Sequence, residues 1–111
     1  MNIQHKELSL GRWSRLSFCE QMANIGSEVG RAINWRKKGN PDYSRLAFER
    51  ALELLDLTIE DKTNLKRLRE IVRLREVLAD YFAFDNIYGS TDENVNNYFL
   101  AFNYAARVGR N

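Results

Sequence analysis

The stretch SFCEQMANIGSEVGRAINWRKKGNP, residues 17–41, decides the fold because it holds a whole helix together with its two ends. Ser17 and Glu20 match a capping box, in which each side chain accepts a backbone N–H at the start of a helix. Gly39 is expected to end that helix. Asn40 and Pro41 then begin the next one, Asn40 as the cap and Pro41 in the first turn, where its missing N–H costs nothing. So short a connection makes the two helices antiparallel neighbours.

Apolar residues recur at spacings of three and four along the rest of the chain, which is typical of amphipathic helices. The first helix has its stripe at Phe18, Met22, Ile25, Val29 and Ile33. The third is expected to turn Leu65, Leu68, Ile71, Val72, Leu78 and Phe82 inward. Ser90 and Glu93 form a second capping box before the last helix. We therefore expect helices at about 17–38, 41–60, 62–84 and 91–108, after an N-terminal arm of residues 1–16.

These features predict an all-α fold, an up-down-up-down four-helix bundle that forms one domain over residues 1–111. A chain of 111 residues is long enough for a single core. It has one cysteine, no apolar run of membrane-spanning length and no signal-peptide pattern at its start, MNIQHKELSL. We expect a cytoplasmic protein that does not enter the membrane.

The net charge of +2 hides a modulation along the chain. Residues 1–40 hold seven Lys/Arg against three Asp/Glu, residues 41–61 two against six, and residues 62–80 six against three. This alternation suits pairing between neighbouring helices. It also suits a basic surface that binds phosphates or an acidic partner.

Gly26 and Gly30 lie inside the first helix, where each glycine costs about 1 kcal/mol relative to alanine. On a helical wheel they align with Cys19 and Ala23 in a strip of small residues beside the core stripe. Such a strip lets another backbone approach closely. The approaching backbone can belong to a helix of the same chain or to a second subunit.

Two groups of cations are candidates for binding nucleic acid or a partner protein. Trp35 lies among Lys/Arg at the end of the first helix, and aromatic rings beside cations can stack bases while the cations bind phosphates. Alternatively, the arm or the 84–94 loop covers Trp35, and the cations favour the negative end of the helix. The second group follows one face of the third helix. The candidate residues are Arg31, Trp35, Arg36, Lys37 and Lys38 in the first group and Lys66, Arg69 and Arg73 in the second.

The aromatic C-terminal helix suggests self-association. Phe99 and Phe102 belong to its core stripe by periodicity. Tyr98 and Tyr104 widen the apolar face beyond the needs of one bundle, as an interface between subunits would. We therefore expect a homo-oligomer, with Tyr98 and Tyr104 joining Cys19, Ala23, Gly26 and Gly30 as candidates for close helix packing or an oligomer interface.

The chemistries of common enzymes find little support in the residues. His5 is the only histidine, so zinc, di-iron and Arg-x4–6-His ribonuclease sites lack ligands or bases. Cys19 has no evident base beside it. An acidic stripe at a helical spacing can bind metal or act in acid–base chemistry, but a solvated face or a dock for the basic third helix is favoured for Glu49, Glu53, Asp56 and Glu60. We expect no catalytic residue, no metal, no cofactor and no small-molecule substrate.

Four segments carry a resemblance to a known kind of protein: EQMANIGSEVGRAINW, AFERALELLDLTIED, RLREVLADYF and YGSTDENVNNYF. In helix order the chain resembles the small four-helix-bundle proteins encoded by rRNA intervening sequences. It is also similar to the accessory variability determinants of diversity-generating retroelements. This resemblance implies a homo-oligomeric barrel of bundles, often pentameric, whose basic surface contacts nucleic acid and a reverse transcriptase. The chain departs from that pattern in being only mildly basic.

The sequence thus favours a non-catalytic, self-associating adaptor that binds RNA or an RNA-handling enzyme such as a retroelement reverse transcriptase. The alternative is a helical partner subunit of a separate nucleotidyltransferase or toxin, acting like an antitoxin.

Overall fold

The computed structural model describes residues 10–108, and all the regular structure in this range is helical. This confirms the all-α class. The elements are α1 (Leu10–Trp13), α2 (Phe18–Lys37), α3 (Pro41–Glu60), the 3-10 helix η1 (Lys62–Arg67), α4 (Leu68–Ala83) and α5 (Asp92–Val108). The described part thus has five α-helices where four were expected, because short α1 occupies part of the segment expected to be an arm. His5 lies outside the described residues.

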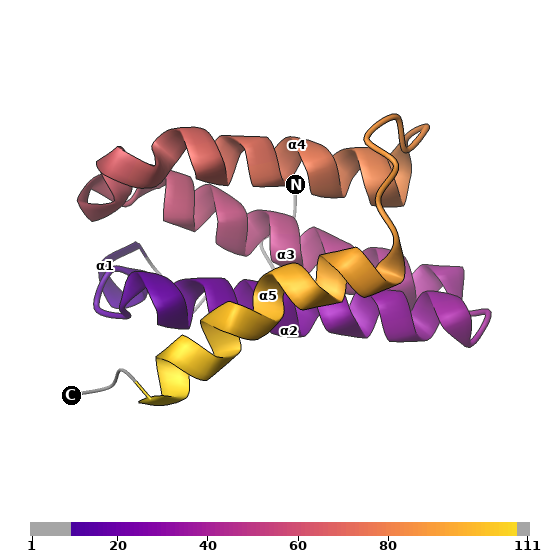
Figure 1. Ribbon diagram of the computed structural model, residues 1–111, viewed down its shortest axis with the longest axis horizontal. Coiled ribbons are helices and arrows are strands. Elements are labelled where there is room, and N and C mark those ends of the chain that lie inside the picture. Colours follow the sequence, from indigo (N-terminus) through magenta and orange to yellow (C-terminus); the bar gives the residue numbers. More distant parts are fainter. Residues whose placement is uncertain (1–9, 109–111) are drawn as a thin grey trace.

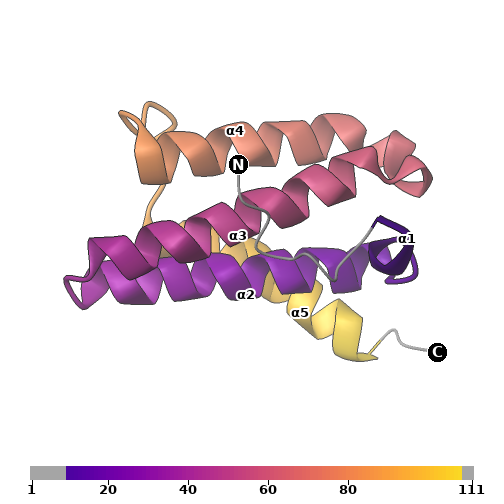
Figure 2. The ribbon, with the colours of Figure 1, turned by 180° about the vertical axis from the view of Figure 1, so that it is seen from behind.

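The helices pack in a pattern that does not follow chain order throughout. Helices α2 and α3 lie side by side, α4 packs on α3, and α5 crosses the face of α2 obliquely (Figures 1 and 2). Consecutive helices α4 and α5 therefore rest on different partners. Between residues 10 and 108, no helix combines the length and the apolarity that crossing a bilayer requires.

The ends of α2 and the start of α3 form as the sequence predicts. Ser17 and Glu20 make both hydrogen bonds of the capping box, at 3.1 and 2.9 Å. Gly39 has a φ of +78°, a left-handed conformation that glycine adopts at low cost after a helix. The Asn40 side chain accepts the Tyr43 N–H at 3.0 Å and caps α3. The tight turn is thus specified by local chemistry.

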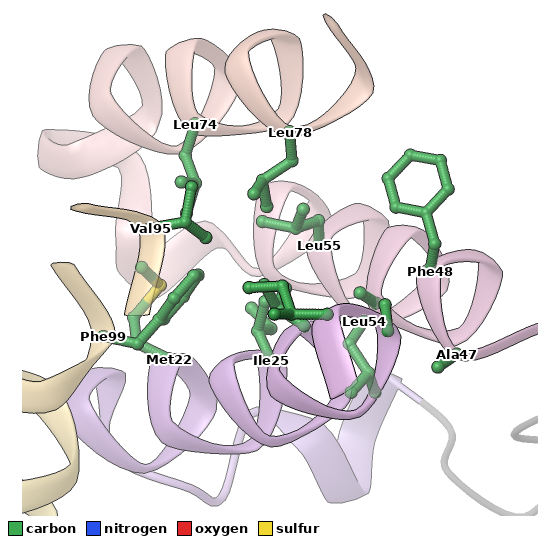
Figure 3. Packing of buried hydrophobic residues seen from close by; sticks show 14 of the residues in the cluster. Met22, Ile25, Ala47, Phe48, Leu54, Leu55, Leu74, Leu78, Val95 and Phe99 are labelled. Atoms are coloured by element: carbon green, nitrogen blue, oxygen red, sulfur yellow. The ribbon is translucent and has the colours of Figure 1, made fainter. Parts of the chain in front are cut away.

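The core fills the space among α2, α3, α4 and α5 (Figure 3). Met22, Ile25, Val29 and Ile33 are fully buried, which confirms most of the α2 stripe. Two positions of the third stripe are wrong: Leu65 is 64% exposed and Val72 is 37% exposed. Leu65 lies in η1, where a 3-10 helix turns 120° per residue and shifts the side chain out of the α-helical phase.

The start of α5 differs from the expected capping box. Thr91 and Asn94 exchange side-chain hydrogen bonds with each other's backbone N–H, at 3.1 and 3.0 Å. The cap therefore lies one residue after the predicted Ser90. Ser90 is committed to the preceding turn, since its N–H donates to the Asn86 side chain at 2.8 Å.

A buried polar network joins the end of the fold where α1, α2, α3 and η1 meet. The Trp13 indole N–H donates to the Thr58 hydroxyl at 2.9 Å, and Trp13 is only 1% exposed. The Gln21 amide donates to Asp61 at 2.9 Å and accepts from the Asn64 amide at 2.9 Å. Burial alone would raise the pKa of Asp61, but hydrogen bonds from Gln21 and Thr63 outweigh it, so that pKa lies below its usual value. A satisfied network of this kind fixes how the helices meet.

Candidate partner-binding surfaces

The strip of small residues on α2 divides into two parts with different neighbours. A Cβ added at Gly26 would lie 2.8 Å from Cβ of Phe99 on α5, closer than atoms of this kind approach one another. A Cβ added at Gly30 would meet no atom of residues 10–108 within 4 Å. Gly26 therefore allows close packing within the same chain, whereas the surface at Gly30 is open.

The other two members of the strip are half-buried. Cys19 is a free thiol in the first turn of α2. Ala23 borders a surface hollow whose other walls come from α5, among them Leu100 and Tyr104. The strip thus runs along the crossing of α2 and α5 and reaches the surface beside it.

Tyr98 and Tyr104, predicted together, lie on different flanks of α5. The Tyr98 hydroxyl donates to the Glu70 carboxylate of α4 at 2.9 Å. Burial, followed by this hydrogen bond and the negative charge of Glu70, raises the pKa of Tyr98 above its usual value. Tyr104 is 66% exposed and lies in a row with Leu100 and Val108, which are 63% and 58% exposed. We call Leu100, Tyr104 and Val108 the α5 outer face.

Two of the predicted cations near Trp35 are already engaged within the chain. Arg31 pairs with Glu28 at 3.1 Å, and the same carboxylate is bound by Arg50 of α3 at 3.2 Å. Arg36 pairs with Asp92 at 3.2 Å, and its guanidinium carbon lies 4.4 Å from the centre of the Tyr81 ring. Arg36 therefore joins the end of α2 to α4 and α5.

Trp35 itself is half-buried and has an aromatic neighbour in α3. Its ring meets the Tyr43 ring edge-on, with centroids 4.8 Å apart, and the Lys38 amine lies 5.2 Å from the Trp35 ring. Lys37 is exposed. The neighbour that partly covers Trp35 is thus Tyr43, a residue that neither interpretation of the sequence had named.

Three titratable side chains from α2, α4 and α5 meet at Asp92. The Tyr81 hydroxyl donates to the Asp92 carboxylate, and Arg36 binds the same oxygen. Burial and this hydrogen bond raise the pKa of Tyr81 to about 12, although the Arg36 charge opposes the shift. Burial would raise the pKa of Asp92, but the bonds from Tyr81 and Arg36 outweigh it and lower that pKa. The junction holds the start of α5 in place.

Lys66, Arg69 and Arg73 are exposed, and within residues 10–108 none of them has an ion pair or hydrogen bond. Other cations do pair between helices, as Arg75 does with Asp56 of α3 at 2.9 Å. Arg69 precedes Tyr81 by twelve residues in α4, so it lies about 18 Å along the helix from the Arg36 junction. The two predicted groups of cations therefore do not merge into one surface.

An apolar groove between α4 and α5 went unnoticed in the sequence. Its volume is about 260 Å³. Figure 3 shows the side chains of Leu74 of α4 and Val95 of α5 pointing toward one another. The groove is lined by Glu70, Arg73, Leu74, Val77, Leu78, Ser90, Asn94, Val95, Tyr98 and Phe99. Periodicity identified several of these as core residues, but the gap depends on how α4 and α5 diverge.

The loop between α4 and α5 is held by a carboxylate that sequence reasoning also missed. Asp80, 7% exposed, accepts the backbone N–H groups of Ile87 and Tyr88 at 2.8 and 3.1 Å. Phe84 and Ile87 are nevertheless 75% and 80% exposed. The loop thus has a fixed shape and displays apolar side chains.

The acidic residues of α3 do not gather into a ligand set. Asp56 pairs with Arg75, and Glu53 is buried while Glu60 is exposed. Among the described residues, no three His, Cys, Asp or Glu side chains come together as metal ligands do.

Comparison of the chain with known protein families, with curated proteins and with solved structures finds no match.

Proposed function

We propose that this chain is a non-catalytic cytoplasmic adaptor that associates with copies of itself through the α5 outer face. In this proposal the four long helices, α2, α3, α4 and α5, form an up-down-up-down bundle, and the interface lies on α5. The observation that carries the proposal is the row of Leu100, Tyr104 and Val108, each more than half exposed and spaced four residues apart. A row of exposed apolar side chains at this spacing favours helix packing between subunits.

The surroundings of this row support the same assignment. The hollow between Ala23 and the α5 outer face gives an incoming side chain a place to insert. Gly30 follows on the same face of α2 as Ala23, and the open space beside it admits a second backbone. Full burial of each of the three exposed side chains is worth roughly 1.5–3 kcal/mol. That gain is comparable with the lower estimates of the cost of association, so we expect concentration-dependent assembly.

Light scattering after size-exclusion chromatography tests the proposal. The mass should rise above the 13.0 kDa of one chain as concentration increases from about 10 μM to about 1 mM. Leu100→Glu combined with Tyr104→Glu should return it to one chain, because two carboxylates would have to be desolvated in the interface. Val72→Glu, an exposed apolar position on α4, is the matched control and should leave the mass unchanged. A wild-type mass of 13.0 kDa at every concentration would refute self-association.

RNA binding is the second candidate, favoured by Lys66, Arg69 and Arg73, which are exposed and have no ion-pair partner in the part of the chain that the structure describes. If these residues contact phosphates, replacing all three by Gln should weaken binding to single-stranded RNA. It should also flatten the dependence of log K on log salt by about 0.7 per contact. Arg45→Gln, on the exposed face of α3, is the control for charge alone. An unchanged slope in the triple variant would exclude this surface.

A further inference from the structure

The groove between α4 and α5 has the dimensions of a site for side chains of a docked segment. Its volume of about 260 Å³ is slightly below the range of about 300–1,000 Å³ usual for pockets that hold a whole small ligand. Its walls extend from Glu70 to Leu78 of α4, eight residue steps, or about 12 Å along the helix axis. Two turns of a helix cover that length, which places one or two large apolar side chains in the groove.

The ends and floor of the groove define how such a segment would lie. The Tyr98–Glu70 hydrogen bond closes one end, and Ser90 lies at the other, where α5 begins. Leu74 and Phe99 form part of an apolar floor. An amphipathic helix laid between α4 and α5 would bury its anchors there, at positions i, i+3 or i+4, and i+7.

The rim of the groove is positively charged on its α4 side. Arg73 lines the groove, and Arg69 lies one turn before it on the exposed face of α4. Neither has an ion-pair partner within residues 10–108. Glu70, the one carboxylate in the lining, accepts the Tyr98 hydroxyl and offsets one of the two arginine charges, so the α4 side keeps a net positive charge. A segment with Asp or Glu beside its apolar anchors would therefore meet charges of opposite sign.

From these observations we propose that the α4–α5 groove binds an acidic amphipathic helix of a partner protein, with apolar anchors against Leu74, Val77 and Phe99 and carboxylates facing Arg69 and Arg73. The proposal rests on the adaptor role above and names the class of partner. It does not depend on self-association, because the groove and the α5 outer face lie on opposite flanks of α5.

The test uses the full chain and a designed fluorescent peptide as the probe. The peptide is an amphipathic helix with Leu and Phe anchors at i, i+4 and i+7 and Glu beside them. A second peptide with Lys in place of every Glu is its matched control. Fluorescence anisotropy should show that the acidic peptide binds at least tenfold more tightly than the basic one. Its affinity should fall with added salt without disappearing, since the anchors contribute independently of charge.

Two variants locate the site, one at exposed Arg73 and one at partly buried Val77. Val77→Glu places a carboxylate at the groove and should weaken binding of the acidic peptide about tenfold. Arg73→Glu should weaken it by a similar factor, whereas Arg45→Glu on α3 should change it less than about twofold. Circular dichroism and thermal melting of each variant check that it is folded.

Four results would overturn the proposal. Binding of both peptides with equal affinity would show that charge does not contribute to recognition. Unchanged peptide affinity in Val77→Glu would show that the groove is not the binding site. Binding of single-stranded RNA that is lost when Arg69 and Arg73 are replaced, with no peptide binding, would assign the surface to nucleic acid. Dissociation of an oligomer by Val77→Glu would assign the groove to a second copy. Loss of self-association in the Leu100/Tyr104 variant with peptide binding retained would refute neither proposal, and it would confirm that the two surfaces are separate.

Discussion

Alanine at position 26 and alanine at position 30 should change the stability of this protein in opposite directions. Both glycines lie inside α2, so each replacement gains about 1 kcal/mol of helix propensity. At Gly26 the new methyl group would lie 2.8 Å from Cβ and 2.9 Å from Cγ of Phe99. Overpacking of this kind costs about 1–3 kcal/mol. The net effect of Gly26→Ala is therefore a loss of about 0–2 kcal/mol.

Gly30→Ala is the matched control, since it brings the same gain in helix propensity and its methyl group would meet no atom of the described residues within 4 Å. Its free energy of unfolding should rise by about 1 kcal/mol, which places the two variants about 1–3 kcal/mol apart. Truncating Phe99 would not rescue Gly26→Ala, because the nearest atom is the Cβ that alanine keeps.

Urea unfolding followed by circular dichroism measures both values, and a protein concentration well below about 10 μM, where one chain is expected, keeps assembly out of the comparison. Thermal melting should separate the variants by about 4 °C or more. If Gly26→Ala stabilises the protein as much as Gly30→Ala does, α5 does not pack against Gly26 as described.

Three further outcomes are expected. Thr58→Val should lower the free energy of unfolding by about 1–3 kcal/mol, because it leaves the buried Trp13 N–H without an acceptor; urea unfolding monitored by fluorescence checks this, and an unchanged midpoint would contradict it. Arg36→Gln should cost about 1–2 kcal/mol by breaking the Asp92 junction, whereas Lys37→Gln should stay within about 0.5 kcal/mol; equal effects in thermal melts would refute the distinction. Because the pKa of Asp92 is lower in the folded state, its contribution is present above the unfolded value of 3.8 and is lost as the pH falls below it. Asp92→Asn should therefore flatten the loss of stability in acid, measured by urea unfolding across this range, and a slope equal to that of the wild type would count against the junction.

Local signals in the sequence were sufficient for part of the fold. Ser17, Gly39 and Asn40 specify the ends of helices through contacts within four residues, so the α2–α3 turn could be predicted from a short stretch. The cap of α5 was misplaced by one residue. The Ser90 N–H donates to the Asn86 side chain, and this hydrogen bond depends on the shape of the whole loop.

The features of the fold and of the candidate surfaces that could not be predicted from the sequence depend on contacts between distant residues. The prediction that Leu65 points inward assumed that residues 62–67 are part of the α-helix. They form a 3-10 helix instead, so the α-helical periodicity does not apply to Leu65. Composition identified Arg36 as one cation among several, but its partner Asp92 lies 56 residues away. The α4–α5 groove depends on the relative placement of two helices, and no local sequence pattern encodes that placement. The candidate surfaces could thus be listed from sequence, whereas their engagement within the chain could not.

The packing of α5 on α2, instead of on its chain neighbour α4, has a consequence for local stability. Helix α5 is joined to α4 by a structured loop, yet its main packing surface is on α2. Detachment of α5 would break this packing, the Asp92 junction and the Tyr98–Glu70 hydrogen bond, but it would leave the packing of α3 on α2 and on α4 in place. Regions with few supporting partners open below the free energy of global unfolding. Amide hydrogen exchange should accordingly be faster along α5 than along the buried faces of α2 and α3, and α5 could then change its position on α2 without unfolding the α2–α3 pair.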